Sequence, residues 1–457
     1  MKKSNILIIG VLITQLIYLP SCKKFVEIAP PKNQLVGSQI FADSLDATAA
    51  ITGIYVSMVN AAALGFSSGG LTLYPALSSD EMNQTGTDVS LAEFYNDGIS
   101  VNNSVNKSLW SGAYKLIYST NACLEGISGS NTLAAQTKSR MMGEVRCIRA
   151  LLYFNLVNLY GSVPVVTATD FNTNELSARS PVTAVYQKIK DDLIYAKGAL
   201  PKTGFVTQRA NYYAAVALLS KVALYTGDNE LALSAATEII NSNNFKLLAD
   251  LNGVFLAASQ ESIWKIIPVF PNRETWEGYY FAPSSATTKP KYTISNALYN
   301  AFDANDQRKV KWITVNTVSG VKYPYPSKYK KASTTTTPTE NYTIMRLAEI
   351  YLIRAEARAL LNDFTGALAD LNTTRNRASL GNMTGSDQDS ILTAIEKERQ
   401  LEMFCEWGNR WFDLKRYGHA TSVLGAFKTS WKNTSQLYPI PINEITANPS
   451  LLQNPGY

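Results

Sequence analysis

Residues 211–240 read NYYAAVALLSKVALYTGDNELALSAATEII. Apolar and alanine residues occupy most sides of the range 211–225, which predicts a buried helix. The turn residues Thr-Gly-Asp follow at 226–228, and the range 230–240 predicts a second helix. Because alanine side chains are small, the two helices can pack closely against each other. The stretch therefore predicts a helical hairpin.

A second stretch has the same shape. The range 344–362 predicts a helix, a turn follows at Asp363, and the range 366–377 predicts its partner. Both hairpins resemble tetratricopeptide repeats, although their spacing does not keep a period of about 34 residues. Stacked hairpins bury one continuous core. We therefore expect a mainly α fold in which tetratricopeptide-like helix pairs form a solenoid scaffold, with long irregular loops and little β structure.

The rest of the chain divides around these hairpins. Apolar residues at steps of three and four predict further helices at 44–58, 110–124, 140–160 and 181–200. Gly, Ser, Thr, Asn and Asp dominate residues 65–106, which favours loop over most of that segment. The helical pattern also breaks at residues 244–341, where only 263–266 predicts a short strand. We expect one domain over residues 43–457, made of a helical half at 43–243, a loop-rich ligand region at 244–341 and a helical half at 342–457.

Composition excludes several classes of function. The net charge is +6, only 17% of residues are charged and no dense Lys/Arg block occurs, so a nucleic-acid partner is not expected. The single histidine, His419, excludes a His-based metal cluster, and its place past a helix-like run predicts a solvated residue. Cys123, Cys147 and Cys405 are widely spaced and odd in number, so no disulfide framework or zinc site follows. We predict buried thiols at Cys147 and Cys405, and no metal or cofactor.

The N-terminus has the features of a secretory signal. Basic residues at 2–3 precede an apolar run at 6–19, which is shorter than the roughly 20 residues of a membrane span. The sequence Leu-Pro-Ser-Cys then ends at Cys22 and resembles a bacterial lipoprotein signal. We expect residues 1–21 to be removed, Cys22 to carry lipid (a palmitate-type anchor) and residues 22–42 to form a tether. Ordinary secretion with a chance cysteine near the cut is the alternative.

Four parts of the chain together resemble a known family. They read GEVRCIRA at 143–150, LYGSVP at 159–164, RLAEIYLIRAEA at 346–357 and RWFDLKR at 410–416, with the tail YPIP at 438–441 and QNPGY at 453–457. In this order, and together with the lipid signal, these motifs are similar to those of the SusD/RagB family of outer-membrane lipoproteins.

This resemblance implies a function. It implies a non-enzymatic protein, lipid-anchored in the outer membrane and facing the cell exterior, that captures a nutrient oligosaccharide. The captured ligand would pass to a SusC-type TonB-dependent transporter, the expected protein partner. A peptide-binding RagB-like protein is the first alternative, a surface glycosidase is a less favoured one, and a purely protein-binding scaffold is the third.

Paired carboxylates are the feature that a glycosidase would need. Glu398 and Glu402 stand four residues apart, but one helix places both on the same side without an opposing face. We therefore predict structural ion pairs with nearby arginines such as Arg399. The same interpretation applies to Glu144 with Arg146 and Arg149, and to Asp413 with Arg410 and Arg416. No catalytic residue is predicted.

Loop aromatics are the better candidates for ligand contact. Sugars present C–H faces and hydroxyl edges, which rings and small polar groups recognise. Two regions supply such residues, one at 74–96 and one at 276–325. The predicted ligand-binding residues are Tyr74, Asp80, Asn83, Tyr95, Trp276, Tyr279, Tyr280, Trp312, Tyr323 and Tyr325.

Overall fold

A computed structural model describes residues 40–61 and 63–457. The predicted signal peptide, Cys22 and all but the last three residues of the tether lie outside this range. Phe41 is buried, and its ring packs where a side chain on Gly126 would stand. The chain therefore already joins the fold at Phe41, within the last residues expected to form the tether.

The two predicted hairpins are confirmed. Helices α10 (Tyr212–Tyr225) and α11 (Asn229–Asn241) pack together, as do α15 (Leu347–Leu360) and α16 (Phe364–Arg377). Side chains cap three of these helices, because Asn211, Asp228 and Asp363 each accept a backbone N–H in the first turn. The alanines of α10 are fully buried, which allows the close packing that their size predicts.

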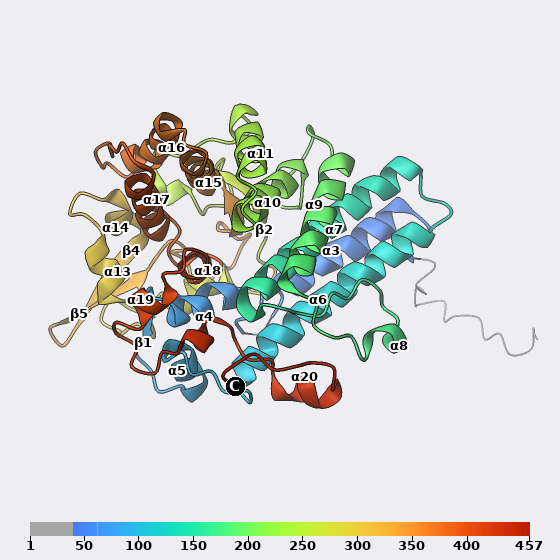
Figure 1. Ribbon diagram of the computed structural model, residues 1–457, viewed down its shortest axis with the longest axis horizontal. Coiled ribbons are helices and arrows are strands. Elements are labelled where there is room, and N and C mark those ends of the chain that lie inside the picture. The colour runs from blue at the N-terminus through green and yellow to red at the C-terminus, as the bar shows by residue number, and fades with distance from the viewer. Residues whose placement is uncertain (1–39, 62) are drawn as a thin grey trace, which may run out of the picture.

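These hairpins belong to one continuous stack (Figure 1). Five further helices belong to it, namely α3 (Ser44–Val59), α6 (Ser104–Gly129), α7 (Ala135–Tyr160), α9 (Val182–Ala199) and α17 (Gln388–Glu402). Along the stack, α3 packs on α6, α6 on α7, α7 on α9 and α9 on α10. Beyond the first hairpin, α11 packs on α15, and α15 packs on both α16 and α17. The predicted mainly α solenoid is therefore the observed scaffold.

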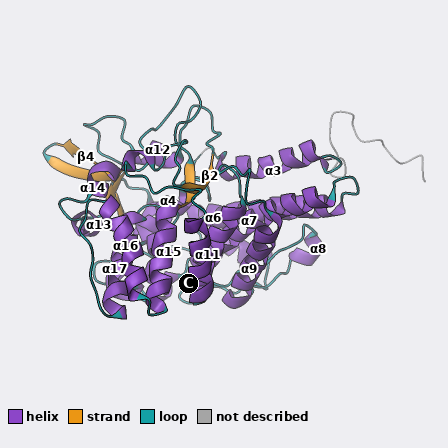
Figure 2. Cartoon of the chain, turned by 90° about the horizontal axis from the view of Figure 1, so that it is seen from above, coloured by secondary structure: helices purple, strands orange, loops and turns teal. Residues whose placement is uncertain are grey.

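The loop-rich region is an insertion between α11 and α15. Strand β2 (Ser262–Ile266) pairs antiparallel with β6 (Tyr342–Arg346), so the two ends of the insertion lie together. Figure 2 shows that α12 and the loops around it lie on one side of the row of helices. The short elements inside the insertion are η2 Leu251–Gly253, α12 Trp276–Phe281, β3 Tyr292–Ile294, α13 Asn296–Ala301, α14 Gln307–Trp312, β4 Ile313–Val318 and β5 Val321–Pro326.

Two predictions about local structure were wrong. The helix expected from residue 344 begins only at Leu347, because residues 342–346 form β6, buried along its whole length. The segment 65–106, expected to be mostly loop, contains α4 (Gly70–Ser78), β1 (Met82–Gln84) and α5 (Val89–Tyr95). Every residue of α4 is buried, so this helix has no polar face and no amphipathic period by which it could be recognised.

The C-terminal tail returns along the scaffold. After α18 (Asn409–Arg416) and α19 (Ala420–Leu424), η3 (Asn433–Gln436) and α20 (Ile442–Ala447) follow.

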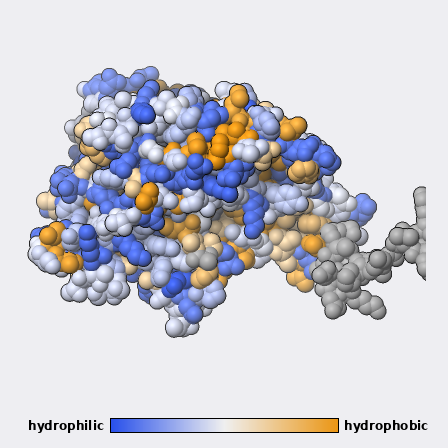
Figure 3. Space-filling view, turned by 90° about the horizontal axis from the view of Figure 1, so that it is seen from below, coloured by the Kyte–Doolittle hydropathy of each residue, from blue (hydrophilic) through white to orange (hydrophobic). Residues whose placement is uncertain are grey.

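Figure 3 shows that the face viewed from below is mainly hydrophilic with small hydrophobic patches. Phe171, in α8 (Phe171–Asn174), and Leu452 are exposed apolar side chains. None of the helices in residues 40–61 and 63–457 combines the length and the apolar character that crossing a membrane requires.

Candidate functional site

A small sheet brings together the two regions in which ligand residues were predicted. Strand β1 pairs antiparallel with β3, with Asn83 opposite Thr293 and Gln84 opposite Tyr292. The backbone N–H of Thr85 also donates to the carbonyl of Lys291 at 2.9 Å. Residues more than 200 positions apart in the chain therefore share one surface region at this sheet.

Helix α12 supplies an aromatic cluster beside the sheet. The ring centre of Trp276 lies 5.4 Å from that of Tyr279 and 5.5 Å from that of Tyr280, and the two tyrosine rings are 5.3 Å apart. Trp276 is only 2% exposed, whereas Tyr279 is 37% exposed and Tyr280 is half-buried. Three predicted ligand residues are thus in contact, with Trp276 beneath and the two tyrosines at the surface.

Basic side chains lie over the rings at this surface. The guanidinium carbon of Arg273 is 3.8 Å from the ring centre of Tyr279. The ammonium of Lys291 is 5.9 Å from the ring centre of Tyr280. A third cation, Lys289, lies 5.3 Å from the ring centre of Tyr323 on β5. These distances are within the range of cation–π attraction.

Two N–H groups in the cluster lack an acceptor. The indole Nε1 of Trp276 and the guanidinium Nε of Arg273 are both buried and have no hydrogen-bond partner among the described residues. An unpaired buried donor costs roughly 1–3 kcal/mol.

Two further tyrosines, Tyr74 and Tyr292, lie near Tyr280. Burial, with Tyr292 and Tyr280 nearby and then the carboxylate of Asp88, raises the pKa of the Tyr74 hydroxyl above its ordinary value. Burial, followed by Tyr280 and Asp88, raises the pKa of Tyr292 to about 12. These hydroxyls therefore stay protonated at neutral pH and keep their hydrogen-bond donors.

Several predicted ligand residues are buried and make contacts within the protein. Trp312 is 0% exposed, and its indole N–H donates to the carbonyl of Leu251 at 3.0 Å. Tyr74 and Tyr325 are also buried. Asp80 is buried in a bidentate ion pair with Arg410. The physical reason is the same in each case: the surrounding segments fold over these groups and use them for packing or charge pairing.

Two other predicted residues, Asn83 and Tyr95, are half-buried and belong to elements other than α12. Asn83 lies on β1, within the shared surface region. Tyr95 ends α5, with the ammonium of Lys428 5.6 Å from its ring centre. The structure therefore leaves Asn83, Tyr279, Tyr280 and Tyr323 as surface candidates, with Trp276 buried beneath the two tyrosines of α12.

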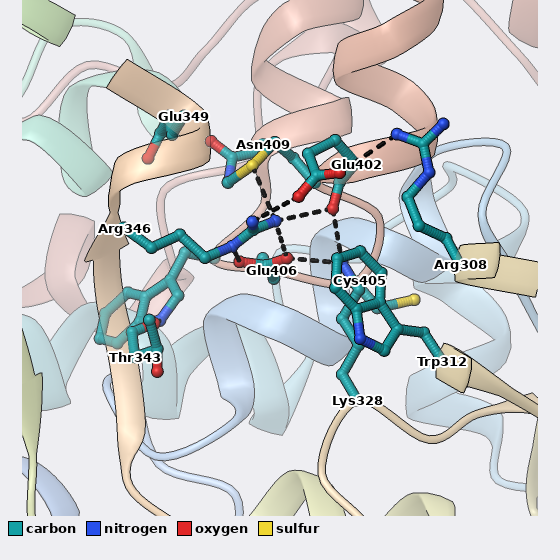
Figure 4. A network of polar contacts seen from close by, with 12 residues as sticks. Arg308, Trp312, Lys328, Thr343, Arg346, Glu349, Glu402, Cys405, Glu406 and Asn409 are labelled. Atoms are coloured by element: carbon teal, nitrogen blue, oxygen red, sulfur yellow. Dashed lines mark hydrogen bonds and ion pairs between the residues drawn. The ribbon is translucent and has the colours of Figure 1, made fainter. Parts of the chain in front are cut away.

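The site is held on the scaffold by a buried ion-pair network (Figure 4). Arg346, at the end of β6, donates to Glu406 at 2.8 and 2.9 Å, and to Glu261 at 3.1 Å. Arg308, at the start of α14, donates to Glu398 at 2.6 Å. All of these groups are buried. The network thus joins the insertion to the C-terminal helix α17.

Glu402 is the centre of this network. It pairs with Arg346 at 2.5 Å, with Arg308 at 3.1 Å and with Arg377. Burial alone would raise its pKa, but the three guanidinium groups outweigh burial and hold the pKa of Glu402 well below its ordinary value. The predicted structural ion pairing of Glu398 and Glu402 is confirmed, but the predicted partner Arg399 is wrong, because Arg399 pairs with Asp413.

The other predicted ion pairs form with partly different partners. Asp413 pairs with Arg416 as predicted but with Arg399 in place of Arg410, and it is buried. Glu144 pairs with Arg209, whereas Arg149 pairs with Asp192 on α9. The unpredicted partners Arg399, Arg209 and Asp192 come from other segments of the chain, which tertiary packing brings close.

The remaining polar candidates are structural. His419 begins α19 with a half-exposed side chain, as predicted, and its Nδ1 is 2.8 Å from Glu396. Cys147 and Cys405 are buried free thiols, as predicted, and so is Cys123. Within the part of the chain that the structure describes, no three His, Cys, Asp or Glu side chains gather as a metal site.

Sequence reasoning missed three members of the site. Arg273, Lys289 and Lys291 stand in loops and follow no motif. Their positions between aromatic residues were the only available signal, since Arg273 is six residues before Tyr279 and Lys291 is next to Tyr292. Only the fold shows which ring each cation covers.

Comparison with known families covers most of the chain in two parts. Residues 24–224 match a family described as starch-binding and associating with the outer membrane. Residues 265–457 match the SusD family. The two matches fall on either side of a short gap, at α11 and the start of the insertion.

Individual relatives agree with these matches. A SusD-like protein of Formosa agariphila is 27% identical over 519 residues and covers all of both chains. The starch-binding protein SusD of Bacteroides thetaiotaomicron is 25% identical and covers 73% of this chain and 74% of its own. A SusD superfamily structure from Bacteroides vulgatus has a TM-score of 0.81 at 20% identity, covering 91% of this chain and all of its own. A laminarin-binding SusD-like protein has a TM-score of 0.75 at 24% identity, covering 90% and 99%.

Proposed function

From the premise that this chain belongs to the SusD/RagB family, we propose that it captures a nutrient oligosaccharide at the cell surface and delivers it to a SusC-type TonB-dependent transporter. The observation that carries the proposal is the cluster on α12. There the surface rings of Tyr279 and Tyr280 lie beside two donors, in Trp276 and Arg273, that lack acceptors. The names of its relatives, which include starch- and laminarin-binding proteins, support a glycan ligand.

The chemistry of the cluster suits a sugar. Aromatic rings contact the C–H groups of a pyranose, while N–H and hydroxyl groups bind its oxygens. We propose that Tyr279, Tyr280 and Tyr323 contact the ligand, that Trp276 supports their rings from below, and that Asn83 borders the same surface. The ion-pair network keeps these loops in place, so binding does not have to order them first.

The lipid anchor completes the proposal. Cys22 would carry the acyl chains, and residues 22–42 would link it to α3. Such a segment spans at most roughly 70 Å when fully extended. The protein could then swing against a transporter without leaving the membrane. A ligand favours the closed arrangement only if it binds that arrangement more tightly than the open one.

Titration calorimetry against a panel of polysaccharides and peptides tests the binding function. We expect saturable binding to at least one polysaccharide, with unchanged chain length of that polysaccharide after prolonged incubation. Hydrolysis products would indicate a glycosidase, and binding to peptides alone would indicate a RagB-like function. Detergent extraction of the native membrane should co-purify a TonB-dependent barrel, and its absence would contradict the transport step.

A further inference from the structure

We propose that the ligand is an anionic glycan, whose carboxylate or sulfate groups bind to Arg273, Lys289 and Lys291. This inference rests on the proposed function and specifies its substrate class. Three observations lead to it: the charge of the inserted region, the position of its cations over aromatic rings, and the absence of ion pairs between those cations and carboxylates of the described residues.

The insertion is the positively charged part of the protein. Residues 244–341 contain 12 Lys and Arg against 7 Asp and Glu. Five of these seven acids are buried, which leaves Asp250 and Asp303 as its exposed carboxylates. The exposed charge of this region is therefore almost entirely basic. A surface of one sign attracts ligands of the other sign.

The cations occupy the ring faces on which a neutral sugar would stack. Arg273 lies 3.8 Å from the centre of the Tyr279 ring, a distance at which the guanidinium covers that face. Lys291 and Lys289 lie over Tyr280 and Tyr323. Each ring thus positions a cation at the surface. At these ring faces a ligand would therefore contact a cation before it contacts the tyrosine ring.

The three cations lack carboxylate partners among the residues that the structure describes. Elsewhere the arginines of the core are paired, as in the bidentate contact of Arg149 with Asp192. The acids nearest to Arg273 in sequence turn inward. Glu274 accepts from the backbone N–H groups of Thr339 and Glu340 at 2.9 and 3.0 Å. Glu277 is buried. The positive charge is therefore left for an external anion.

The type of anion follows from the donors. A guanidinium binds the two oxygens of a carboxylate or the oxygens of a sulfate through parallel N–H groups. Lysine ammonium groups add point charges without fixing geometry. The terminal N–H groups of Arg273 make no ion pair with a carboxylate among the described residues, so they are the donors that an anion would meet. Uronic acids and sulfate esters both offer this acceptor chemistry on a sugar ring.

Calorimetry with matched polysaccharides tests the substrate class. The carboxylate probes are polygalacturonate and alginate, the sulfate probes are κ-carrageenan and dextran sulfate, and the neutral probes are agarose, dextran and laminarin. We expect at least one anionic probe to bind at least about tenfold more tightly than any neutral probe, with an affinity that falls as salt rises. Tighter binding of a neutral probe, independent of salt, would overturn the anionic inference and leave the proposed function intact. Binding of no polysaccharide would contradict both.

Arg273→Gln tests the assigned residue, with Arg140→Gln, an exposed arginine on α7, as the matched control. The first change should weaken binding of the preferred anionic probe by about ten- to a hundredfold, and the control by less than about twofold. Arg273→Lys should restore part of the affinity, since it restores the charge but not the paired N–H groups. If Arg273→Gln misfolds, the double variant of the exposed Lys289 and Lys291 to Gln replaces it. Unchanged affinity in a folded variant would overturn the assignment.

Discussion

Replacing Glu402 by Gln is expected to lower the free energy of unfolding by about 3–5 kcal/mol. The carboxylate of Glu402 is fully buried and neutralises Arg308, Arg346 and Arg377. Glutamine has nearly the same shape but no charge, so the variant breaks one buried ion pair of each of these three guanidinium groups at once. Because Arg308 belongs to the insertion and Glu402 to α17, the same change should loosen the attachment of the loop-rich region to the scaffold.

Asp389→Asn is the matched control, since it removes one negative charge from an exposed position in the first turn of the same helix. Its cost should stay below about 1 kcal/mol, the usual size of a helix-dipole effect. Urea unfolding monitored by tryptophan fluorescence measures both variants. Equal losses in the two variants would show that the network does not stabilise the fold.

The acid dependence of stability gives a second readout of Glu402. Its pKa is well below the ordinary value of 4.5 in the folded protein. The unfolded chain therefore takes up a proton first as the pH falls. The stabilisation from Glu402 is fully present above its unfolded pKa and is lost as the pH falls toward its folded pKa. Between pH 5 and 3, the wild-type protein should lose stability more steeply than Glu402→Gln.

Replacing Cys22 by Ala should release the protein from membranes. Each buried CH₂ group of an acyl chain contributes about 0.8 kcal/mol, so several chains hold a protein firmly, whereas an unmodified N-terminus has no such anchor. The described part of the chain offers no membrane-spanning helix to replace the anchor. Membrane fractionation followed by immunoblotting measures the change.

Cys123→Ala is the control, because Cys123 is a buried thiol within α6. It should leave the protein in the membrane fraction. Mass spectrometry of the mature wild-type protein should find acyl groups on Cys22 as its first residue. An unmodified N-terminus, or a Cys22→Ala protein that stays in the membrane fraction, would contradict the lipid anchor.

The scaffold could be predicted from the sequence because its signals are local. Apolar spacing and turn residues placed α10, α11 and α16 within one or two residues of their observed bounds. Helix α4 escaped prediction because it is buried on all sides, and β6 escaped because its partner β2 lies about 80 residues away. Local patterns do not carry such long-range pairing.

The site was harder to predict than the scaffold. An aromatic residue in a loop-rich segment can face solvent or the core, and the sequence alone did not separate Tyr279 from Trp312. The difference comes from tertiary neighbours, because Trp312 lies against Arg346 and Lys328 in the network, at 5.5 and 4.6 Å from its ring centre. Ion pairing at Glu402 was predictable from helix geometry and nearby arginines, whereas its burial and the identities of its three partners were not.

We propose that the loop-rich insertion binds the glycan and that the helix pairs serve as its scaffold. Hydrogen–deuterium exchange with and without the tightest-binding polysaccharide tests it directly. We expect slower exchange in residues 273–292 and 314–325, and unchanged exchange in α10, α11 and α15. Slower exchange confined to those helices, with no change in the insertion, would contradict glycan binding by the insertion.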